Sequence, residues 1–224
     1  MKQILDKIFL RSNTLDKVSQ NIKKLTEKTP AQKIFDSINS YSSESEIRYV
    51  GGCVRKIINK ENVDDIDLAT NLEPKQVCEA LKSSNINYYE SGIDHGTITA
   101  LEDKYKFEIT TLRKDISTDG RHAKVKFSKD WKEDASRRDF TINSIYSDKD
   151  GNLFDPYNGK GDLENGIINF IGDKDKRIKE DYLRILRYLR FFLNYSKHPH
   201  TPENIRALKI NIGGISKLSK ERLL

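Results

Sequence analysis

The sequence is poor in cysteine and has no long apolar runs, which excludes disulfide-rich, membrane-spanning and secreted proteins. Only two cysteines, Cys53 and Cys78, occur among 224 residues, too few for a disulfide framework or a cysteine-based metal cluster. We expect each to be a small core residue. No apolar run approaches the ~20 residues that a membrane-spanning helix requires, and the charged N-terminus lacks the apolar stretch of a secretory signal. We therefore expect a globular protein of a reducing cytosol or organelle matrix, with the cytoplasm as the predicted location, and without a membrane partner.

The charge is unevenly distributed along the chain. The whole chain carries 40 Lys and Arg against 34 Asp and Glu, a net +6. Residues 171–224 hold 13 of the basic and 6 of the acidic residues, a net +7, which leaves −1 for the rest. All of the surplus positive charge is therefore C-terminal, where it allows an anionic partner without identifying one.

The order of apolar patterns and turn residues predicts an α+β domain followed by a basic helical segment. Residues 113–132 are polar and basic, and we expect a long loop there. The expected helices cover residues 1–28, 31–35, 54–59, 73–81, 136–143 and 176 onward, and the expected strands cover 47–50, 63–68, 96–100, 105–110, 152–154 and 167–171.

Asp65-Ile66-Asp67 is the first candidate for chemistry. Residues two apart in a strand share a face, so we expect both carboxylates to point the same way and to suit Mg²⁺, which prefers hard oxygen ligands. The alternative is a solvated acidic strand end. Gly51-Gly52, between an expected strand and helix, favours a phosphate-binding turn with Arg55 beside it, although a plain tight turn shows the same pattern. Together the two features predict a nucleoside triphosphate site with Mg²⁺.

A series of motifs then resembles one family. They occur in the order GGCVRKIIN, DDIDLAT, HGTIT, FEITTLRKDISTDGRHA, WKEDASRRDFTINS, DPYNGKGDLENG and RIKEDYLRILRYLRFF. Together they resemble class II tRNA nucleotidyltransferases (CCA-adding enzymes) and bacterial poly(A) polymerases, most closely the branch with α-proteobacterial and mitochondrial enzymes. The resemblance runs from about Ile47 to Phe192, and residues 215–224 resemble the start of the family's last head-and-neck motif.

The resemblance implies a polymerase-β-like nucleotidyltransferase head, a small mixed or antiparallel sheet with flanking helices, followed by a helical neck. We expect a helical extension over residues 1–30, the head over 31–172 and a nucleotide-selecting, RNA-binding neck over 173–224. From its length we expect the chain to be without the family's body and tail domains, as either a truncated or a naturally reduced enzyme. The expected oligomeric state stays open.

The resemblance also assigns roles to individual residues. Asp65 and Asp67 match the family's catalytic metal-binding pair. Glu108 lies on an expected strand with Phe107 and Ile109 on its opposite face, so it is a candidate third carboxylate or an ordinary exposed residue.

Arg137-Arg138-Asp139-Phe140-Thr141-Ile142-Asn143 matches the motif that holds ribose and triphosphate. We expect both arginines to bind phosphate, and Asp139 and Asn143, four apart on a helical face, to bind the ribose hydroxyls. The alternative is that one arginine pairs with Glu133 or Asp134 while Asp139 caps a helix.

Glu180-Asp181-Tyr182-Leu183-Arg184 matches the family's amino-acid template for the base. We expect Asp181 and Arg184, three apart on a helix, to meet over one turn. Asp181 can accept a hydrogen bond from the amino group of cytosine or adenine while Arg184 donates to the ring nitrogen. Uracil and guanine reverse the order of donor and acceptor, so they would leave both side chains unpaired. A surface ion pair is the alternative. Arg187 and Arg190 follow Arg184 at the same three-residue spacing. We expect them to bind the RNA backbone or the triphosphate, and the alternative is a solvated basic face.

Two further features bear on the family's chemistry. The loop at 113–132 matches a flexible loop held to shift the pocket from CTP to ATP, and His122 is its one candidate histidine. Lys56 stands where the family has an acidic residue after Arg55, which removes a partner of that arginine. The implied function is template-independent, Mg²⁺-dependent addition of C, C and A to tRNA 3′ ends from CTP and ATP. The alternatives are a poly(A) polymerase, a CC- or A-adding specialist, or a non-catalytic RNA-binding remnant.

Overall fold

The computed structural model describes residues 17–118 and 123–223, in two compact units. The first unit contains the described residues up to Leu112 together with Tyr146–Phe154, and the second contains Arg113–Ile145 and the chain from Asp155 onward. Residues 146–154 belong to the first unit because they return as a hairpin that pairs with its sheet. Residues 31–172 contain parts of both units, and the expected division at residues 30 and 172 stays a prediction.

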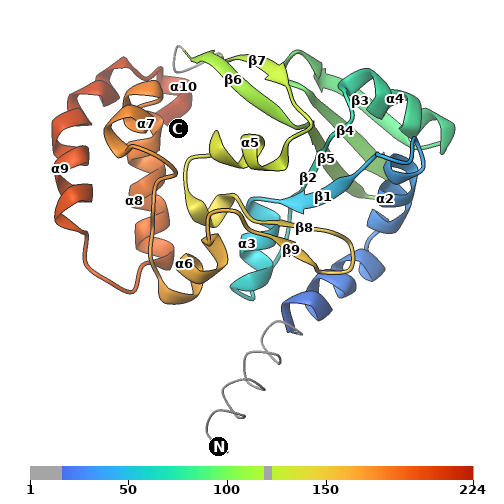
Figure 1. Cartoon of the computed structure of the whole chain (residues 1–224), viewed down its shortest axis with the longest axis horizontal. Coiled ribbons are helices and arrows are strands. Elements are labelled where there is room, and N and C mark those ends of the chain that lie inside the picture. Colours follow the sequence, from blue (N-terminus) through green and yellow to red (C-terminus); the bar gives the residue numbers. More distant parts are fainter. Residues whose placement is uncertain (1–16, 119–122, 224) are drawn as a thin grey trace, which may run out of the picture. The chain divides into compact units, whose positions relative to one another are not determined.

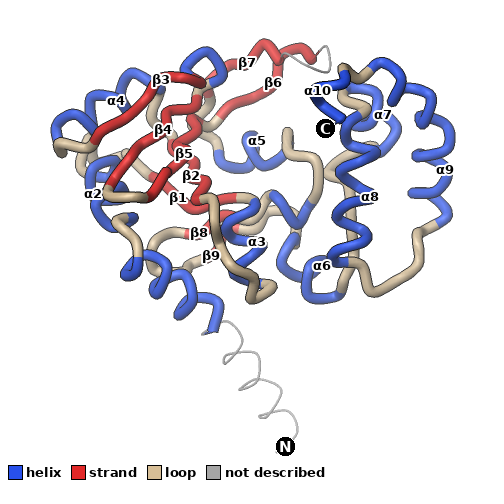
Figure 2. Tube along the Cα trace, turned by 180° about the vertical axis from the view of Figure 1, so that it is seen from behind, coloured by secondary structure: helices blue, strands red, loops and turns tan. Residues whose placement is uncertain are grey.

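The first unit is built on a seven-stranded sheet in the order β3-β4-β5-β2-β1-β8-β9 (Figures 1 and 2). The pairing of β2 with β5 is parallel, and the other pairings are antiparallel. The mixed sheet with flanking helices agrees with the expected α+β fold. After a helix over residues 17–28, its elements are α2 (Ala31–Asn39), β1 (Ile47–Val50), α3 (Gly52–Ile58), β2 (Ile66–Thr70), α4 (Pro74–Ser83), β3 (Asn87–Gly92), η1 (Ile93–His95), β4 (Thr97–Glu102), β5 (Tyr105–Thr111), β8 (Tyr146–Ser147) and β9 (Leu153–Phe154).

Alternation along the central strands separates an apolar face of the sheet from a polar one. Leu68 on β2 and Ile98 and Ile109 on β4 and β5 are fully buried, as are Phe35 of α2 and Leu81 of α4. Helices α2 and α4 pack against each other, and α4 also packs on β3 and β4. The residues between the buried ones on β2 and β5 are the polar ones, and the site described below is built from them.

The second unit combines a two-stranded hairpin with a group of helices. Phe140 is its aromatic centre and contacts Phe170, Phe191 and Tyr188, with ring centroids 4.7, 5.4 and 6.2 Å away. Helices α7, α8 and α9 lie together (Figure 1). The elements are β6 (Arg113–Thr118), β7 (Ala123–Phe127), α5 (Trp131–Ser136), η2 (Thr141–Asn143), α6 (Gly159–Asn165), α7 (Lys174–Glu180), α8 (Leu183–Tyr195), α9 (Pro202–Asn211), η3 (Ile212–Lys217) and α10 (Lys220–Leu223).

Several expected elements were wrong. The expected loop at 113–132 contains β6, β7 and the start of α5, and the expected helix at 136–143 is the end of α5, a turn and η2. The expected strand at 167–171 is reduced to a bridge between Phe140 and Phe170. The expected helix from residue 176 is interrupted at Asp181, which has an extended backbone. In the part of the chain that the structure describes, no helix is both long enough and apolar enough to cross a membrane.

Candidate nucleotide site

The glycine pair forms the turn between β1 and α3. Gly51 has φ 65° and ψ −122°, a conformation in which a side chain is strained, and it is the N-cap of α3. At Gly52 a Cβ would lie 3.8 Å from both Arg55 Nη2 and Asp67 Oδ2, which is ordinary contact. The start of α3, the buried Arg55 and the carboxylate of Asp67 therefore meet at one place in the first unit.

Two carboxylates stand in register on the polar face of the sheet. Asp67 on β2 is the direct partner of Glu108 on the parallel strand β5, and neighbouring residues in register project from the same face. Asp67 is half-buried and Glu108 is exposed. Asp65 occupies a bend before β2, so the expectation that Asp65 and Asp67 share one strand was wrong. The strand begins at Ile66, and Asp65 is an exposed residue at its entry.

These carboxylates suit a cation that is shared with a substrate. Within the described ranges, no three His, Cys, Asp or Glu side chains form a ready metal cluster. Mg²⁺ does not need such a cluster, since it is commonly held by one or two carboxylates and completes its shell with water and substrate phosphates. The donor set of Asp67, Glu108 and the adjacent Asp65 therefore fits a magnesium ion by its hard oxygen chemistry.

Cys53 follows the glycine turn but is not a nucleophile. Burial, with a smaller contribution from the negative charge of Asp67, raises the pKa of its thiol to about 12. The protonated, buried thiol is a core group, as expected, whereas Cys78 is only half-buried. Lys56 pairs with Asp64, its Nζ 3.1 Å from the carboxylate, so the residue that departs from the family pattern makes its own ion pair.

The adjacent arginines of the second unit converge on one buried carboxylate. Arg137 Nε lies 2.9 Å from one oxygen of Asp134, and Arg138 Nη2 lies 3.1 Å from the other. The Asp134 side chain is 1% exposed. Both arginines thus have a structural partner, where the sequence suggested one at most. Asp134 therefore orients both guanidinium groups, and Arg138 Nη1 also contacts the Asn143 carbonyl.

Asp139 and Asn143 are in contact, although not on a helix. Asn143 Nδ2 donates to Asp139 Oδ1 over 3.0 Å, and Arg187 Nε from α8 lies 2.5 Å from Asp139 Oδ2. Burial opposes ionisation of Asp139, but the charge and hydrogen bond of Arg187, aided by Asn143 and the Phe140 amide, outweigh it and hold its pKa below the usual value. The contact arises from a turn and η2 rather than from a helical face.

Asp181 and Arg184 do not pair with each other. Because the helix is interrupted at Asp181, the i,i+3 contact expected over one turn is replaced by a backbone bond from the Arg184 amide to the Asp181 carbonyl. Arg184 Nη1 instead donates to Glu180 over 2.7 Å, and Arg222 lies 2.9 Å from Asp181. Asp181 also accepts from the Leu183 amide over 3.1 Å.

Arg177 and Arg222 contact the candidate site residues, and the sequence did not indicate either arginine. Arg177 donates to Glu180 over 2.6 Å and to the carbonyls of Arg137 and Arg138, the second over 2.7 Å. The two carbonyl contacts join residues 40 and 39 positions apart, and no local pattern reveals contacts over such a separation. The link from Asp134 to both arginines, by contrast, follows the i,i+3 and i,i+4 spacing. His122 lies outside the described residues.

Comparison with known proteins finds similarity over the part of the chain that contains most of the candidate site residues. Residues 47–169 match the family described as "Poly A polymerase head domain". The mitochondrial CCA tRNA nucleotidyltransferase 1 of Homo sapiens is 48% identical over 181 residues, which cover 80% of this chain and 42% of that protein. A CCA-adding enzyme of Lactobacillus johnsonii is 35% identical, covering 87% of this chain and 48% of its own length.

Solved structures are similar as well. The Bacillus stearothermophilus CCA-adding enzyme in complex with CTP has a TM-score of 0.75 and 29% identity, over 86% of this chain and 45% of that one. A tRNA nucleotidyltransferase complexed with a primer tRNA and an incoming ATP analog has a TM-score of 0.64 and 28% identity, over 81% and 51%. The chain spans about half or less of the length of these relatives.

Proposed function

Since this chain belongs to the poly(A) polymerase head domain family, we propose that it carries the catalytic portion of a CCA-adding enzyme. The proposed reaction is template-independent addition of C, C and A to tRNA 3′ ends, with CTP and ATP as substrates. Its support is the likeness to the human and Lactobacillus proteins, which are named for this activity. As a functional division we propose an extension over residues 1–30, a head over 31–172 and a neck over 173–224.

The observation that carries the proposal is the pairing of Asp67 with Glu108 beside the glycine turn and Arg55. A nucleotidyl transfer needs carboxylates that hold a cation and donors that hold the triphosphate, at one place. Asp65, Asp67 and Glu108 are the proposed carboxylates, with Asp65 and Asp67 as the principal metal ligands. Mg²⁺, when bound there, neutralises triphosphate charge and favours ionisation of the primer hydroxyl.

The residues of the chain itself bind and orient the nucleotide. Gly51 and Gly52 let the backbone approach phosphate closely, and Arg55 contributes positive charge. In the second unit we assign Arg137 and Arg138 to phosphate by their charge, and Asp139 and Asn143 to the ribose. Arg187, which is held by Asp139, neutralises that carboxylate.

Base selection is assigned to Asp181 and Arg184. Arg184 uses Nη1 for Glu180 and for the Arg177 carbonyl, which leaves its other donors for a ring nitrogen. Asp181 accepts two hydrogen bonds, and a carboxylate has lone pairs for more. The contacts of Glu180 and Arg222 therefore orient the two side chains without exhausting them. Such a pair favours cytosine and adenine over uracil and guanine.

The location assigned with this function is a reducing compartment, the cytoplasm. It is supported by the two free thiols, of which Cys53 is buried, since a reducing compartment leaves cysteines unpaired.

The test is stepwise incorporation into tRNA that lacks its CCA end. With Mg²⁺ and labelled CTP alone we expect two additions, and with CTP and ATP we expect a third residue and then arrest. A long A tail from ATP alone would instead assign the chain to the poly(A) polymerases of the same family. Addition of only C, C or only A would make it a specialist, and no incorporation with any nucleotide would leave a non-catalytic RNA-binding protein.

A further inference from the structure

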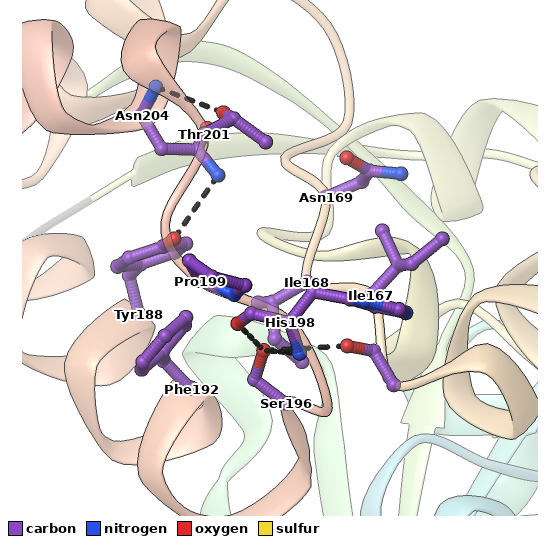
Figure 3. A pocket seen from close by; sticks show the side chains of 11 residues that line it. Ile167, Ile168, Asn169, Tyr188, Phe192, Ser196, His198, Pro199, Thr201 and Asn204 are labelled. Carbon is purple, nitrogen blue, oxygen red and sulfur yellow. Dashed lines mark hydrogen bonds between the residues drawn. The ribbon is translucent and has the colours of Figure 1, made fainter.

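The second unit contains a cavity of about 230 Å³ whose aromatic walls contact one another (Figure 3). The ring of Tyr188 stacks on Phe170 and on Phe192, with centroids 5.6 and 6.0 Å apart. His200 stacks on Phe192 at 3.6 Å. The faces of these rings are therefore occupied by neighbouring side chains, and we assign the cavity no ligand.

An exposed tyrosine of the first unit, by contrast, lies in line with the proposed metal ligands. Tyr89 on β3 pairs with Thr99 on β4, and Thr99 pairs with Glu108 on β5. Glu108 pairs in turn with Asp67 on β2. Residues paired in register project from the same face of a sheet, so these side chains form one row across β3, β4, β5 and β2 (Figure 1). Helix α4 packs on the other face of β3 and β4, where Ala100 is buried.

The Tyr89 ring is open to solvent. The residue is 60% exposed, and among the residues that the structure describes its side chain has no ring partner and no hydrogen bond. Aromatic side chains stack on nucleobases with little regard to sequence, because every base has a flat π-face. An exposed ring at this position therefore suits a base of a single-stranded nucleic acid.

The geometry of the proposed reaction determines on which side of the carboxylates the RNA primer lies. The attacking and leaving oxygens of a nucleotidyl transfer lie in line, on opposite sides of the α-phosphate. The glycine turn, which is proposed to hold the triphosphate, follows β1, and β1 and β5 flank β2 on opposite sides. The triphosphate therefore extends from Asp67 toward β1, and the primer hydroxyl lies on the β5 side, at Glu108. The RNA strand that carries this hydroxyl then continues over β4 and β3 to Tyr89.

Charge and distance agree with this path. Lys106 is an exposed residue two positions before Glu108 on β5, so it lies on the same face and its charge suits a phosphate. Neighbouring strands are ~4.8 Å apart, which places Tyr89 about 10 Å from Glu108 across the sheet. Stacked nucleotides of one strand are ~3.4 Å apart, so this distance spans about three nucleotides.

We propose that the Tyr89 ring stacks on a base within the last three nucleotides of the RNA primer, with Lys106 at a neighbouring phosphate. The inference rests on the proposed function for the direction of the strand, and it adds a contact to the primer that is separate from the base-selecting pair. Tyr89 touches neither the incoming nucleotide nor the reacting atoms, so it is a primer-binding residue and not a catalytic one.

The experiment measures binding of a 5′-labelled RNA stem-loop with a four-nucleotide 3′ overhang to the 224-residue chain. Fluorescence anisotropy is recorded with Mg²⁺ and without nucleoside triphosphates, so that nothing is incorporated. Tyr89→Ala removes the ring and Tyr89→Phe keeps it. Tyr41→Ala is the matched control, since Tyr41 is also exposed but donates to Glu79 on α4, on the helical side of the sheet. The RNA is also made with one abasic nucleotide at each overhang position, and circular dichroism melting confirms that each variant is folded.

We expect Tyr89→Ala to raise the Kd about tenfold, as for the loss of one stacked base, and Tyr89→Phe and Tyr41→Ala to change it less than about twofold. The loss in Tyr89→Ala should disappear when the stacked nucleotide is abasic and persist when another one is. Equal Kd values for Tyr89→Ala and Tyr41→Ala would overturn the proposal, as would a loss that is the same for every abasic position. Normal RNA binding by Tyr89→Ala together with loss of a dimer in light scattering would also overturn it, in favour of pairing between the β3 edges of two copies.

Failure of the proposed function gives a different result from failure of this inference. If the chain does not extend tRNA that lacks CCA, but Tyr89→Ala still weakens binding in the position-dependent way, the RNA contact of Tyr89 stands and the reaction is wrong. If the chain extends the tRNA and Tyr89→Ala leaves the KM for tRNA unchanged, the reaction stands and the contact is wrong.

Discussion

Asp134 shows how one buried carboxylate organises several side chains of the proposed nucleotide site. It lies between Arg137 and Arg138 and also accepts from the Arg113 amide over 3.2 Å. Removing one partner of a buried ion pair leaves charges without compensation, which is far more costly than losing a surface pair. The acidic residue is therefore as important to the motif as the arginines themselves.

We predict that Asp134→Ala lowers the free energy of unfolding by about 3 kcal/mol, measured by urea titration. Glu133→Ala is the neighbouring control, because Glu133 pairs with Lys114 at the surface, and it is expected to change stability little. Equal losses in the two variants would show that burial of Asp134 does not govern its contribution.

Asp139 makes stability depend on pH. Its folded-state pKa is held below the usual value, chiefly by Arg187 against the opposing effect of burial. A carboxyl group with a depressed pKa contributes stability that is complete above its unfolded pKa of about 4 and is lost as the pH falls through the folded value. The acid limb of the stability curve therefore includes this contact.

We predict that in Asp139→Asn the free energy of unfolding decreases less as the pH falls from about 5 to about 2. Urea titration at each pH measures this. Arg187→Gln should raise the pKa of Asp139 toward its unfolded value or above it, because burial is then less opposed, and so shrink or reverse this part of the acid loss. Curves of the Asp139→Asn variant that run parallel to those of the unaltered chain would contradict the assignment.

At the scale of elements, local patterns predicted much of the first unit and less of the second. The strand that ends before Gly51 and the helix that begins at Pro74 were predicted correctly, because glycine and proline mark those ends in the sequence. Strand β6, with the sequence RKDIST, was missed because it lacks the apolar alternation of a half-buried strand. Strand β7, with the sequence AKVKF, does alternate apolar and basic residues and could have been predicted. The interruption at Asp181 was missed because the apolar period continues through it, and tertiary contacts such as Arg222 lie far away in sequence.

Tyr182, next to the helical interruption at Asp181, packs closely against Gly214. A Cβ on Gly214 would lie 2.0 Å from the Tyr182 ring, whereas a Cβ on Gly213 meets nothing within 4 Å. We predict that Gly214→Ala destabilises the chain by about 1–3 kcal/mol through overpacking. Gly213→Ala should be neutral or slightly stabilising. Thermal melts that rank the two variants in the opposite order would contradict this packing.

For the whole molecule, the proposed metal-binding and base-selecting residues lie in parts of the sequence that differ in net charge. The carboxylates of Asp65, Asp67 and Glu108 lie before residue 171, in the part that carries a net −1, and the +7 segment holds Asp181 and its neighbouring arginines. The sequence predicted only that Glu108 projects from the opposite face to Phe107 and Ile109. It could not predict that Glu108 lies in register with Asp67, because long-range pairing sets the order of the strands. The roles of these residues remain predictions that activity must test.

We predict that tRNA binding is strongly salt-dependent, because it relies on the basic segment. Neutralised phosphates release counterions, so affinity falls steeply with salt. Filter binding should show a loss of more than about tenfold between about 50 and 200 mM salt. An affinity that stays constant over this range would argue for contacts other than phosphate.

The most direct measurement is the sequence of the 3′ ends that the chain produces on tRNA lacking CCA, with Mg²⁺ and all four nucleoside triphosphates present. We predict ends that read C, C, A and stop, and unextended tRNA with the Asp67→Asn variant, which keeps the side-chain size but removes the charge. Asp36→Asn is the matched control, since Asp36 lies on the exposed side of α2, and it should extend normally. Ends that carry a run of A, that contain U or G, or that form equally with Asp67→Asn would contradict the account.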